Sequence, residues 1–408
     1  MGKKKVAVIG AGGRANAYLM YGAKETFDLV AIADPNLRNR ETFLGLNDLV
    51  GLVQEYDSWE TMFQKHELDG VIICTPNHSH LLPAVAAMER GIVVALEKPI
   101  AERPDACRQI LESKKAFNAR VLVGFVLRSA PFYRQAKLWI DEGKIGDIVT
   151  IQADEIPPVL TTSVMFRSDW RRFSRFSGGS MNEKCCHDVD LLNWLVDSQP
   201  VSLYSSGGIK SLAPRADLPE RCCDCSATSQ CAYYLPPEIY EHPDMVNRAN
   251  DGLLYKFTRD NSACIYNNGH DLFDHQQTLI SYSCGATATL TLDFSGKGKM
   301  CGRNLKVIGT KGVLFGKLED NQITLFESAT ELETVVDLRI DASGHGGANR
   351  SHTDAFVRLM EDASFESEAT VEAGFLSSMM CFAADESVEK RSHVDLTDIV
   401  QMASAVGM

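Results

Sequence analysis

Short apolar runs alternate with longer amphipathic segments over the first third of the chain. The runs predict buried strands at residues 6–9, 29–33, 68–74, 92–96 and 121–125. The segments between them predict helices, for example over residues 80–90 and 104–119. Strands that are joined by crossover helices form a parallel, doubly wound sheet. The pattern therefore predicts an α/β domain over residues 1–126.

The pattern changes near residue 147, where strict alternation of apolar and polar residues begins to appear. The sequence TATLTLD at residues 287–293 is the clearest case, and similar strands are predicted at 148–155, 278–294, 301–308 and 312–315. Helices are predicted over residues 131–142, 188–195, 352–360 and 372–390. Alternating strands are typical of an antiparallel sheet with one open face. We therefore expect an α+β domain with an open, mostly antiparallel sheet over residues 127–408.

The first strand leads into a glycine-rich turn, KVAVIGAGGRA, at residues 5–15. Gly10, Gly12 and Ala15 have the spacing G-x-G-x-x-A, and Asp34 ends the second strand 24 positions after Gly10. The glycines allow a tight turn and close approach to a pyrophosphate, and the acidic residue accepts a hydrogen bond from a ribose hydroxyl. This pattern predicts dinucleotide binding. We expect the contacts to come from Gly10, Gly12, Gly13, Arg14, Ala15 and Asp34.

The Asp34 carboxylate favours NAD, because it would repel the 2′-phosphate of NADP. Arg38 and Arg40 follow closely and could offset that repulsion. NAD is the expected cofactor on this reasoning.

Composition and charge exclude several classes of partner. The 408 residues carry a net charge of −13, which argues against nucleic-acid or anionic-membrane binding. No apolar run reaches the ~20 residues of a membrane span. The start of the chain shows no signal segment. We expect a cytoplasmic enzyme whose partner is a small molecule.

Polar side chains follow the ends of the later predicted strands. In a parallel sheet these carboxyl ends share one edge, where ligands bind. The residues expected there, as further contacts of the cofactor, are Thr75, Asn77, His80, Glu97, Lys98 and Arg128.

Five motifs in order resemble the Gfo/Idh/MocA family of oxidoreductases. They are the G-x-G-x-x-A turn, CTPNHSH at 74–80, EKP at 97–99, GKIGDIV at 143–149 and a GG…HDVD block at 178–190. The resemblance implies a Rossmann domain followed by an α+β domain and NAD(P)-dependent chemistry on sugars or polyols. It also implies a homo-oligomer, a dimer or tetramer, that assembles through the open sheet.

Lys98 and His187 are the residues that we expect to exchange protons. Lys98 follows a buried strand and precedes a proline, and the resemblance implies that the lysine of EKP contacts substrate and nicotinamide. Glu183 and His187 are four residues apart and share a face if the segment is helical. The family pattern has Asp where this chain has Glu183. We therefore expect Glu183 to hold the substrate or to orient a neighbour.

Further residues are candidates for lining a sugar pocket. An aromatic ring stacks on the apolar face of a sugar, and guanidinium groups donate hydrogen bonds to its hydroxyls. The candidates are Glu155, Trp170, Arg171, Arg172 and His345.

The chain has 12 cysteines, which is many for the cytoplasm. Cys222, Cys225 and Cys231 have the spacing C-x2-C-x5-C in a segment that is poor in regular structure, and Cys264 follows. Four such residues would hold a tetrahedral structural zinc, although only one end of the set has the C-x2-C spacing. The alternative is a set of reduced, buried cysteines.

Three functions are compatible with these residues. The first is hydride transfer between a ring carbinol of a sugar, glycoside or polyol and NAD. The second is a glycosidase that oxidises C3 transiently, eliminates the aglycone, adds water and reduces the ketone again. The third is a non-catalytic dinucleotide sensor, against which the presence of Lys98 and His187 argues.

Overall fold

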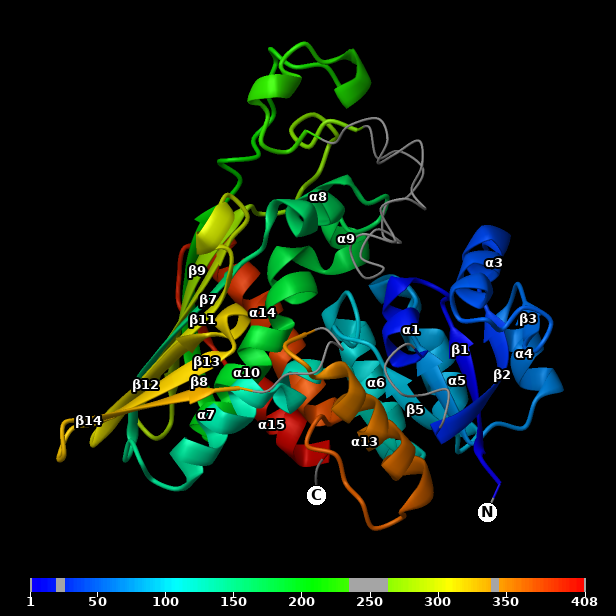
Figure 1. Ribbon diagram of the computed structural model, residues 1–408, viewed down its shortest axis with the longest axis horizontal. Helices are drawn as coiled ribbons and strands as arrows, with labels where there is room; N and C mark the ends of the chain where they lie inside the picture. Colours follow the sequence, from blue (N-terminus) through cyan, green and yellow to red (C-terminus); the bar gives the residue numbers. More distant parts are fainter. Residues whose placement is uncertain (1, 20–25, 235–262, 339–344, 407–408) are drawn as a thin grey trace. The chain divides into compact units, whose positions relative to one another are not determined.

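The computed structural model describes residues 2–19, 26–234, 263–338 and 345–406 (Figure 1). The chain divides into two compact units. Unit 1 comprises Met1–Arg134, Arg339–Met379 and Ile399–Met408, and unit 2 comprises Gln135–Leu338 and Met380–Asp398. A single boundary at residue 126 does not describe this division, because two later segments group with the N-terminal residues.

Unit 1 contains a parallel sheet of six strands in the order β3-β2-β1-β4-β5-β6. This is the doubly wound order in which the chain runs outward in both directions from the first strand. The strands are β1 (Lys4–Ile9), β2 (Phe27–Ala33), β3 (Gln54–Tyr56), β4 (Gly70–Ile73), β5 (Val93–Leu96) and β6 (Val121–Val123). The prediction of a doubly wound α/β fold is confirmed.

Local signals explain several helix boundaries in unit 1. Asn36 and Ser58 cap α3 and α4 by accepting hydrogen bonds from backbone N–H groups. Pro104 is the first residue of α6, and two lysines lie in its last turn, where a positive charge is favourable. The helices are α1 (Gly13–Tyr18), α3 (Leu37–Leu46), α4 (Trp59–Lys65), α5 (Leu81–Glu89), α6 (Pro104–Ala116) and the single turns η2 (Asn77–Ser79) and η3 (Val126–Ser129).

Helix α13 (Asn349–Glu361) returns to unit 1 from a distant part of the sequence. Phe356 of α13 meets Phe27 of β2 edge to face, with ring centroids 6.4 Å apart. Gly70 of β4 has no side chain because a Cβ there would lie 2.8 Å from the Phe356 ring. The apolar face of α13 therefore completes the core of unit 1.

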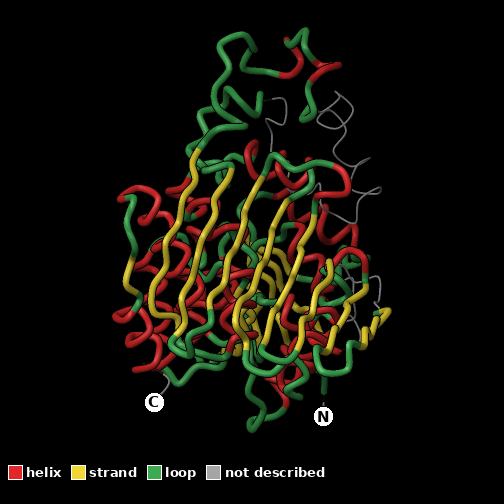
Figure 2. The backbone as a smooth tube through the Cα atoms, turned by 90° about the vertical axis from the view of Figure 1, so that its left-hand side faces the viewer, coloured by secondary structure: helices red, strands yellow, loops and turns green. Residues whose placement is uncertain are grey.

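Unit 2 is built on a sheet of nine strands in the order β14-β13-β12-β11-β7-β10-β9-β8-β15 (Figure 2). The sheet is mixed, because β10 pairs with β7 in parallel while the other neighbouring strands of the described sheet pair antiparallel. The predicted strand at 278–294 is a hairpin that turns at Gly285, whose φ is +89°. The strands are β7 (Ile148–Ile156), β8 (Pro200–Gly208), β9 (His275–Tyr282), β10 (Thr287–Asp293), β11 (Gly302–Gly309), β12 (Gly312–Lys317), β13 (Gln322–Glu327), β14 (Leu332–Asp337) and β15 (Val394–Asp395).

Helix α10 (Cys186–Val196) packs on β7 and β10 of this sheet. The second half of α14 (Val371–Lys390) packs on β8, where Ser387 Oγ accepts a hydrogen bond from Ser205 N at 2.8 Å. The other helices of unit 2 are α8 (Val159–Arg167), α9 (Ser174–Ser177), the π-helix η4 (Met181–Cys185) and the single turns η5 (Cys222–Asp224), η6 (Thr228–Gln230), η8 (Gly298–Met300) and η9 (Leu318–Asp320). Helices α7 (Pro131–Asp141), α14 and α15 (Thr397–Val406) contribute residues to both units.

Burial alternates along the central strands, as the sequence pattern predicted. Leu290 of β10 and Ile280 of β9 are fully buried, whereas Leu279 of β9 and Phe315 of β12 are about two-fifths exposed at 41% and 42%. One face of the sheet thus supplies the core of unit 2, and the other is open. In the parts of the chain that the structure describes, no helix is both long enough and apolar enough to cross a membrane.

Candidate functional site

The turn after β1 lies directly against the turn after β4 in unit 1. Gly10 has φ +88°, and its N–H donates to Ala33 O at 2.8 Å. A Cβ on Gly10 would lie 2.7 Å from the backbone of Cys74 and Thr75. Only glycine has both the conformation and the space that this position requires. The turn therefore packs the bare backbone of Gly10 directly against the backbone that follows β4.

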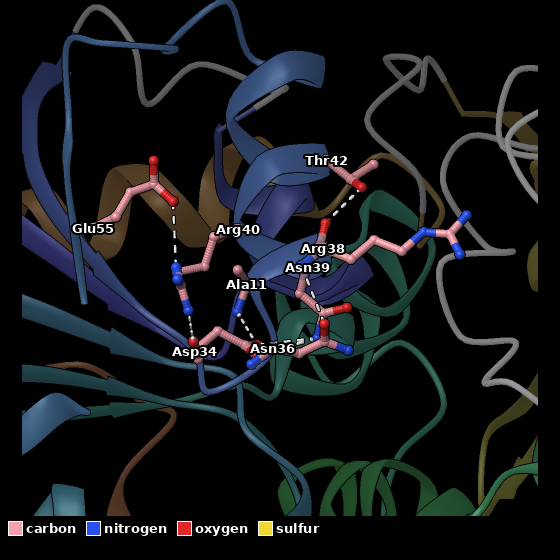
Figure 3. Close-up of polar contacts among 8 residues, drawn as sticks. All are labelled: Ala11, Asp34, Asn36, Arg38, Asn39, Arg40, Thr42 and Glu55. Atoms are coloured by element: carbon pink, nitrogen blue, oxygen red, sulfur yellow. Dashed lines mark hydrogen bonds and ion pairs between the residues drawn. The ribbon is translucent and has the colours of Figure 1, made fainter. Parts of the chain in front are cut away.

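The Asp34 carboxylate lies at the end of β2 and is held by three nitrogen donors (Figure 3). Oδ2 accepts from Ala11 N at 3.0 Å, and Oδ1 accepts from Asn36 N at 2.8 Å. The Asn39 amide lies 3.2 Å from both oxygens. These bonds orient the carboxylate beside the glycine turn. The sequence did not indicate Asn39, which lies on the first turn of α3.

Neither neighbouring arginine contacts the Asp34 carboxylate in the described structure. Arg40 donates to the Asp34 carbonyl oxygen at 2.5 Å and pairs with Glu55 at 3.2 Å. The Arg38 side chain extends away from Asp34 (Figure 3). The negative charge of Asp34 is thus not offset by direct contact with a guanidinium group.

Glu97 and Arg14, both expected at the cofactor, form a buried ion pair with each other. Arg14 Nε lies 2.6 Å from Glu97 Oε1, and Tyr18 Oη donates to the same oxygen at 3.1 Å. Burial alone would raise the pKa of Glu97, but the Arg14 guanidinium holds it below its ordinary value. A Cβ on Gly124 would lie 2.8 Å from this carboxylate, so the end of β6 closes over it. The pair ties the start of α1 to the end of β5.

Two residues of α13 extend this cluster. Arg14 donates to Asn349 Oδ1 at 2.8 Å. Burial, followed by the charge of Arg14, lowers the pKa of His352 to about 3, so this ring is neutral at physiological pH. The sequence did not indicate either residue, because neither belongs to a motif and both are more than 300 positions from Arg14.

His80 connects the turns that follow β4 and β5. Its ring lies 3.0 Å from Thr75 O and 2.9 Å from Pro99 O. Burial lowers the pKa of His80, and a neutral ring can donate to only one of these carbonyls. The structure thus shows a histidine that positions two strand-end turns.

The remaining strand-end candidates follow β4, β5 and β6. Asn77 is 3% exposed, and Thr75 Oγ1 is buried without a hydrogen-bond partner among the described residues. Lys98 follows Glu97 directly after β5 and is half-buried. Arg128 is bound to the backbone, since its Nη1 donates to Glu368 O at 2.6 Å. These residues gather at the carboxyl edge of the sheet in unit 1.

Glu183 and His187 belong to unit 2, where an irregular segment carries them. Gly178 and Gly179, with φ of +85° and +87°, end α9, and the π-helix η4 follows. π-helical turns within helices often occur at functional sites. Glu183 is buried and pairs with Arg171 at 2.9 Å, and the Arg171 guanidinium stacks on Trp170 at 4.0 Å. The structure brings three of the predicted residues together here.

Glu155 lies in a buried ionic cluster of unit 2. Its oxygens lie 3.0 Å from Lys184 Nζ and 2.8 Å from Arg303 Nε. Arg303 also pairs with Asp188 at 2.8 Å. The sequence predicts Glu155 as a substrate contact but does not indicate Arg303, which belongs to no motif.

Two other predicted substrate residues occupy different surroundings. Arg172 donates to Arg167 O at 3.4 Å, and its guanidinium lies over the Phe173 ring at 4.9 Å. His345 belongs to unit 1 and lies in an exposed turn before α13, with φ +49°.

The structure does not support the predicted zinc site. Cys222, Cys225, Cys231 and Cys264 line one cavity of about 130 Å³ in unit 2. Within the described residues, however, no three His, Cys, Asp or Glu side chains are grouped as metal ligands. Cys222 Sγ instead lies 3.7 Å from the buried Arg167 guanidinium, and none of the four cysteines forms a disulfide within the described residues. Spacing placed them around one cavity without bringing the sulfur atoms to ligand positions.

The parallel sheet, the glycine turn and Asp34 are typical of the dinucleotide-binding class of α/β folds. Two family models cover most of the chain. The oxidoreductase family, NAD-binding Rossmann fold, matches residues 4–125, and its C-terminal alpha/beta domain matches residues 137–396. The chain belongs to the Gfo/Idh/MocA family of oxidoreductases, as the motifs predicted.

Several curated relatives are similar over part or most of the chain. YteT of Bacillus subtilis (strain 168), whose name proposes an oxidoreductase, is 25% identical over 381 residues, which cover 85% of each chain. The inositol 2-dehydrogenase of Rhizobium meliloti (strain 1021) is 28% identical over 50% of this chain and 58% of its own length. The 2,7-anhydro-N-acetylneuraminate hydratase of Mediterraneibacter gnavus is 25% identical over 36% of this chain and 39% of its own.

Solved structures share the fold at lower identity. A levoglucosan dehydrogenase in complex with NADH and levoglucosan has a TM-score of 0.73 at 19% identity. The match covers 96% of this chain and 99% of the levoglucosan dehydrogenase chain. An oxidoreductase from Agrobacterium radiobacter in complex with NAD+, L-tartaric acid and magnesium has a TM-score of 0.72 at 14% identity, with 97% and 99% coverage. These likenesses agree with the two-domain fold.

Proposed function

We propose that this oxidoreductase transfers a hydride between a ring carbinol of a sugar, glycoside or polyol and NAD. The observation that carries the proposal is the carboxyl edge of the unit 1 sheet. There Asp34, the glycine turn and Lys98 follow β2, β1 and β5. The inositol and levoglucosan dehydrogenases among its relatives act on compounds of this class.

The residues of unit 1 fit a dinucleotide. A Cβ on Gly10 would clash with the turn after β4, whereas a Cβ on Gly12 would meet no atom within 4 Å, so the space available to a pyrophosphate lies at Gly12. Asp34, oriented by Ala11 N and Asn39, presents a carboxylate to the hydroxyls of an adenosine ribose. The bound cofactor supplies the hydride acceptor or donor.

Lys98 and His187 are the proposed proton-exchanging groups, and each is tested by itself. An ammonium or an imidazole can exchange the proton of a carbinol hydroxyl as the carbon changes oxidation state. Glu183, held by Arg171, is proposed to accept a hydrogen bond from a neighbouring hydroxyl.

A panel of sugars, polyols and glycosides tests the proposal. We expect Lys98→Met and His187→Ala to lower turnover by ~10²–10⁴. Lys65→Met, an exposed lysine of unit 1, is the matched control and should leave turnover unchanged. Wild-type turnover in either variant at saturating substrate would remove that residue from the mechanism.

A second candidate function is favoured by one relative whose name is a hydratase. In this alternative the substrate is oxidised transiently at C3, the C2 proton is lost, a leaving group is eliminated and water adds before the ketone is reduced again. A substrate deuterated at C3 distinguishes the two. Net dehydrogenation leaves the label on the nicotinamide, whereas the glycosidase reaction returns the label to the product and exchanges the C2 proton with solvent. If sugars that bind give neither label transfer nor exchange of the C2 proton, that result favours the dinucleotide-sensing alternative.

NAD is the proposed cofactor, in preference to NADP. Neither Arg38 nor Arg40 contacts the Asp34 carboxylate, so a 2′-phosphate would meet an uncompensated negative charge. Fluorescence titration with NADH and NADPH measures the preference. Tighter binding of NADPH would contradict the reasoning.

We also propose a cytoplasmic homo-oligomer that assembles through the open face of the unit 2 sheet. Tyr204, Leu279 and Phe315 are exposed large hydrophobic residues on this sheet. Sedimentation of Leu279→Lys against the wild type tests the interface, and an unchanged mass would contradict it.

A further inference from the structure

The ionic cluster around Arg303 joins the sheet of unit 2 to the segment that carries the proposed chemistry. Arg303 of β11 and Glu155 of β7 are direct partners across the two antiparallel strands. Arg303 also pairs with Asp188 of α10, and Glu155 also pairs with Lys184 of η4. Two buried carboxylates and two half-buried cations therefore form an ionic set from three parts of the chain.

The order of residues along the segment separates chemistry from attachment. Glu183 and His187, the proposed substrate and proton-exchanging residues, are four positions apart. Lys184 and Asp188, each one position further, are also four apart and carry the ion pairs to the sheet. Residues four apart lie on one side of a helical segment. The ion pairs of Lys184 and Asp188 with the sheet thus set the rotation of this segment about its own helical axis. That rotation determines which way Glu183 and His187 face.

We propose that Arg303 is a positioning residue, which holds the start of α10 through Asp188 and thereby places His187 and Glu183 for the reaction. The backbone here needs such an attachment, because two glycines of positive φ and a π-helix precede α10. The Arg303 guanidinium holds Asp188 with two donors, since its Nε donates to Oδ1 at 2.8 Å and its Nη2 donates to Oδ2 at 3.4 Å. Glu155 Oε2 lies 2.8 Å from the same Nε as an ion pair. A lysine amine is a single point charge and lacks this fork.

Asp188 makes this attachment dependent on pH. Burial raises its pKa to about 6, although the Arg303 guanidinium acts in the opposite direction. The titratable and charged groups that face Asp188 are Arg303 of β11, Glu155 of β7, Lys184 and Cys185 of η4, and Cys381 of α14. Protonation below pH 6 removes one of the two anions that Arg303 holds. The start of α10 should then be held less firmly.

Asp188→Asn tests the proposal, because it removes the charge and keeps the shape. The inference rests on the proposed function only for its activity readout. We expect kcat/KM to fall by about 10²-fold, the effect of a misplacement of ~1 Å, with most of the loss in kcat. Asp188→Glu should recover part of the loss. Asp217→Asn, which breaks the exposed pair with Arg215 in the same unit, is the matched control and should change neither parameter.

Amide hydrogen exchange over residues 181–190 tests the positioning without reference to turnover. In the wild type we expect protection to fall by about tenfold or more between pH 8 and pH 5, as a charged hydrogen bond is lost. Asp188→Asn should show the low protection at both pH values, and Arg303→Gln should match it if it folds. The same pH dependence of protection in wild type and Asp188→Asn would overturn the proposal. Absent turnover with normal exchange behaviour would instead count against the proposed function.

Discussion

Asp385 offers a direct test of how burial shapes the stability of unit 2. It lies on the second half of α14 against Gly179, where a Cβ would lie 2.5 Å from Asp385 Oδ2. Oδ1 is buried and has no hydrogen-bond partner among the described residues. Burial raises the pKa of Asp385 to about 7 from an ordinary 3.8, and Gln276 offsets only part of this effect. The perturbation that we consider is Asp385→Asn, which mimics the neutral acid.

The direction of the pH effect follows from the raised pKa. Between pH 3.8 and 7 the folded chain binds this proton and the unfolded chain does not, so stability falls as pH rises. The difference between the folded and the ordinary pKa of Asp385 corresponds to about 4 kcal/mol of unfolding free energy, at ~1.4 kcal/mol per pKa unit. Between pH 5 and pH 8 the loss is about 2.5 kcal/mol of unfolding free energy. With an unfolding entropy of ~2.1 cal/mol/K per residue over 408 residues, this loss of unfolding free energy corresponds to a shift of about 3 °C in melting temperature.

The assay is the melting temperature of wild type and Asp385→Asn at pH 5 and pH 8. The variant cannot ionise, so we expect it to gain about 3 °C relative to the wild type between the two pH values. Asp224→Asn, an exposed residue of unit 2, is the matched control and should follow the wild type. If the difference between wild type and Asp385→Asn is the same at both pH values, Asp385 does not titrate in this range and the reasoning is refuted.

Three further predictions concern the dinucleotide turn, the α13 cluster and the cysteines. Gly10→Ala should weaken NADH binding by tenfold or more, which corresponds to ~1.4 kcal/mol, because a Cβ there would lie 2.7 Å from the turn after β4. An unchanged affinity in a titration would contradict this close approach. His352 should stay neutral between pH 5 and pH 8, because its pKa is lowered to about 3, and an NMR inflection in that range would refute this. Iodoacetamide should label the exposed Cys223 and Cys284 first, and early labelling of buried Cys381, whose pKa burial raises, would be incompatible with the core.

Local patterns explain why much of unit 1 could be predicted. The apolar run at 6–9 lies in β1, the first three residues of the run at 121–125 form β6, and the proline at 104 begins a helix. Gly10 and Asp34 were found because the turn that they build depends on spacing within one βαβ unit. Such signals involve residues close in the sequence, where backbone conformation and periodicity decide the outcome.

Long-range partners could not be predicted in the same way. The sequence indicated Glu97 and Arg14 as cofactor contacts, and only the structure shows that they pair with each other and that Arg14 also binds Asn349. It indicated four cysteines as zinc ligands by their spacing, but spacing does not determine whether sulfur atoms converge.

By itself the sequence determined the order of strands and helices, the glycine turn with its acidic partner and the family of the chain. Only the tertiary structure decided that α13 completes unit 1, that the unit 2 sheet is mixed and that Arg303 joins Glu155 to Asp188. The physical reason is that a buried charge must find an opposite charge, and any of several arginines could satisfy that requirement. Strand register placed Arg303 opposite Glu155, and register depends on how the whole sheet packs.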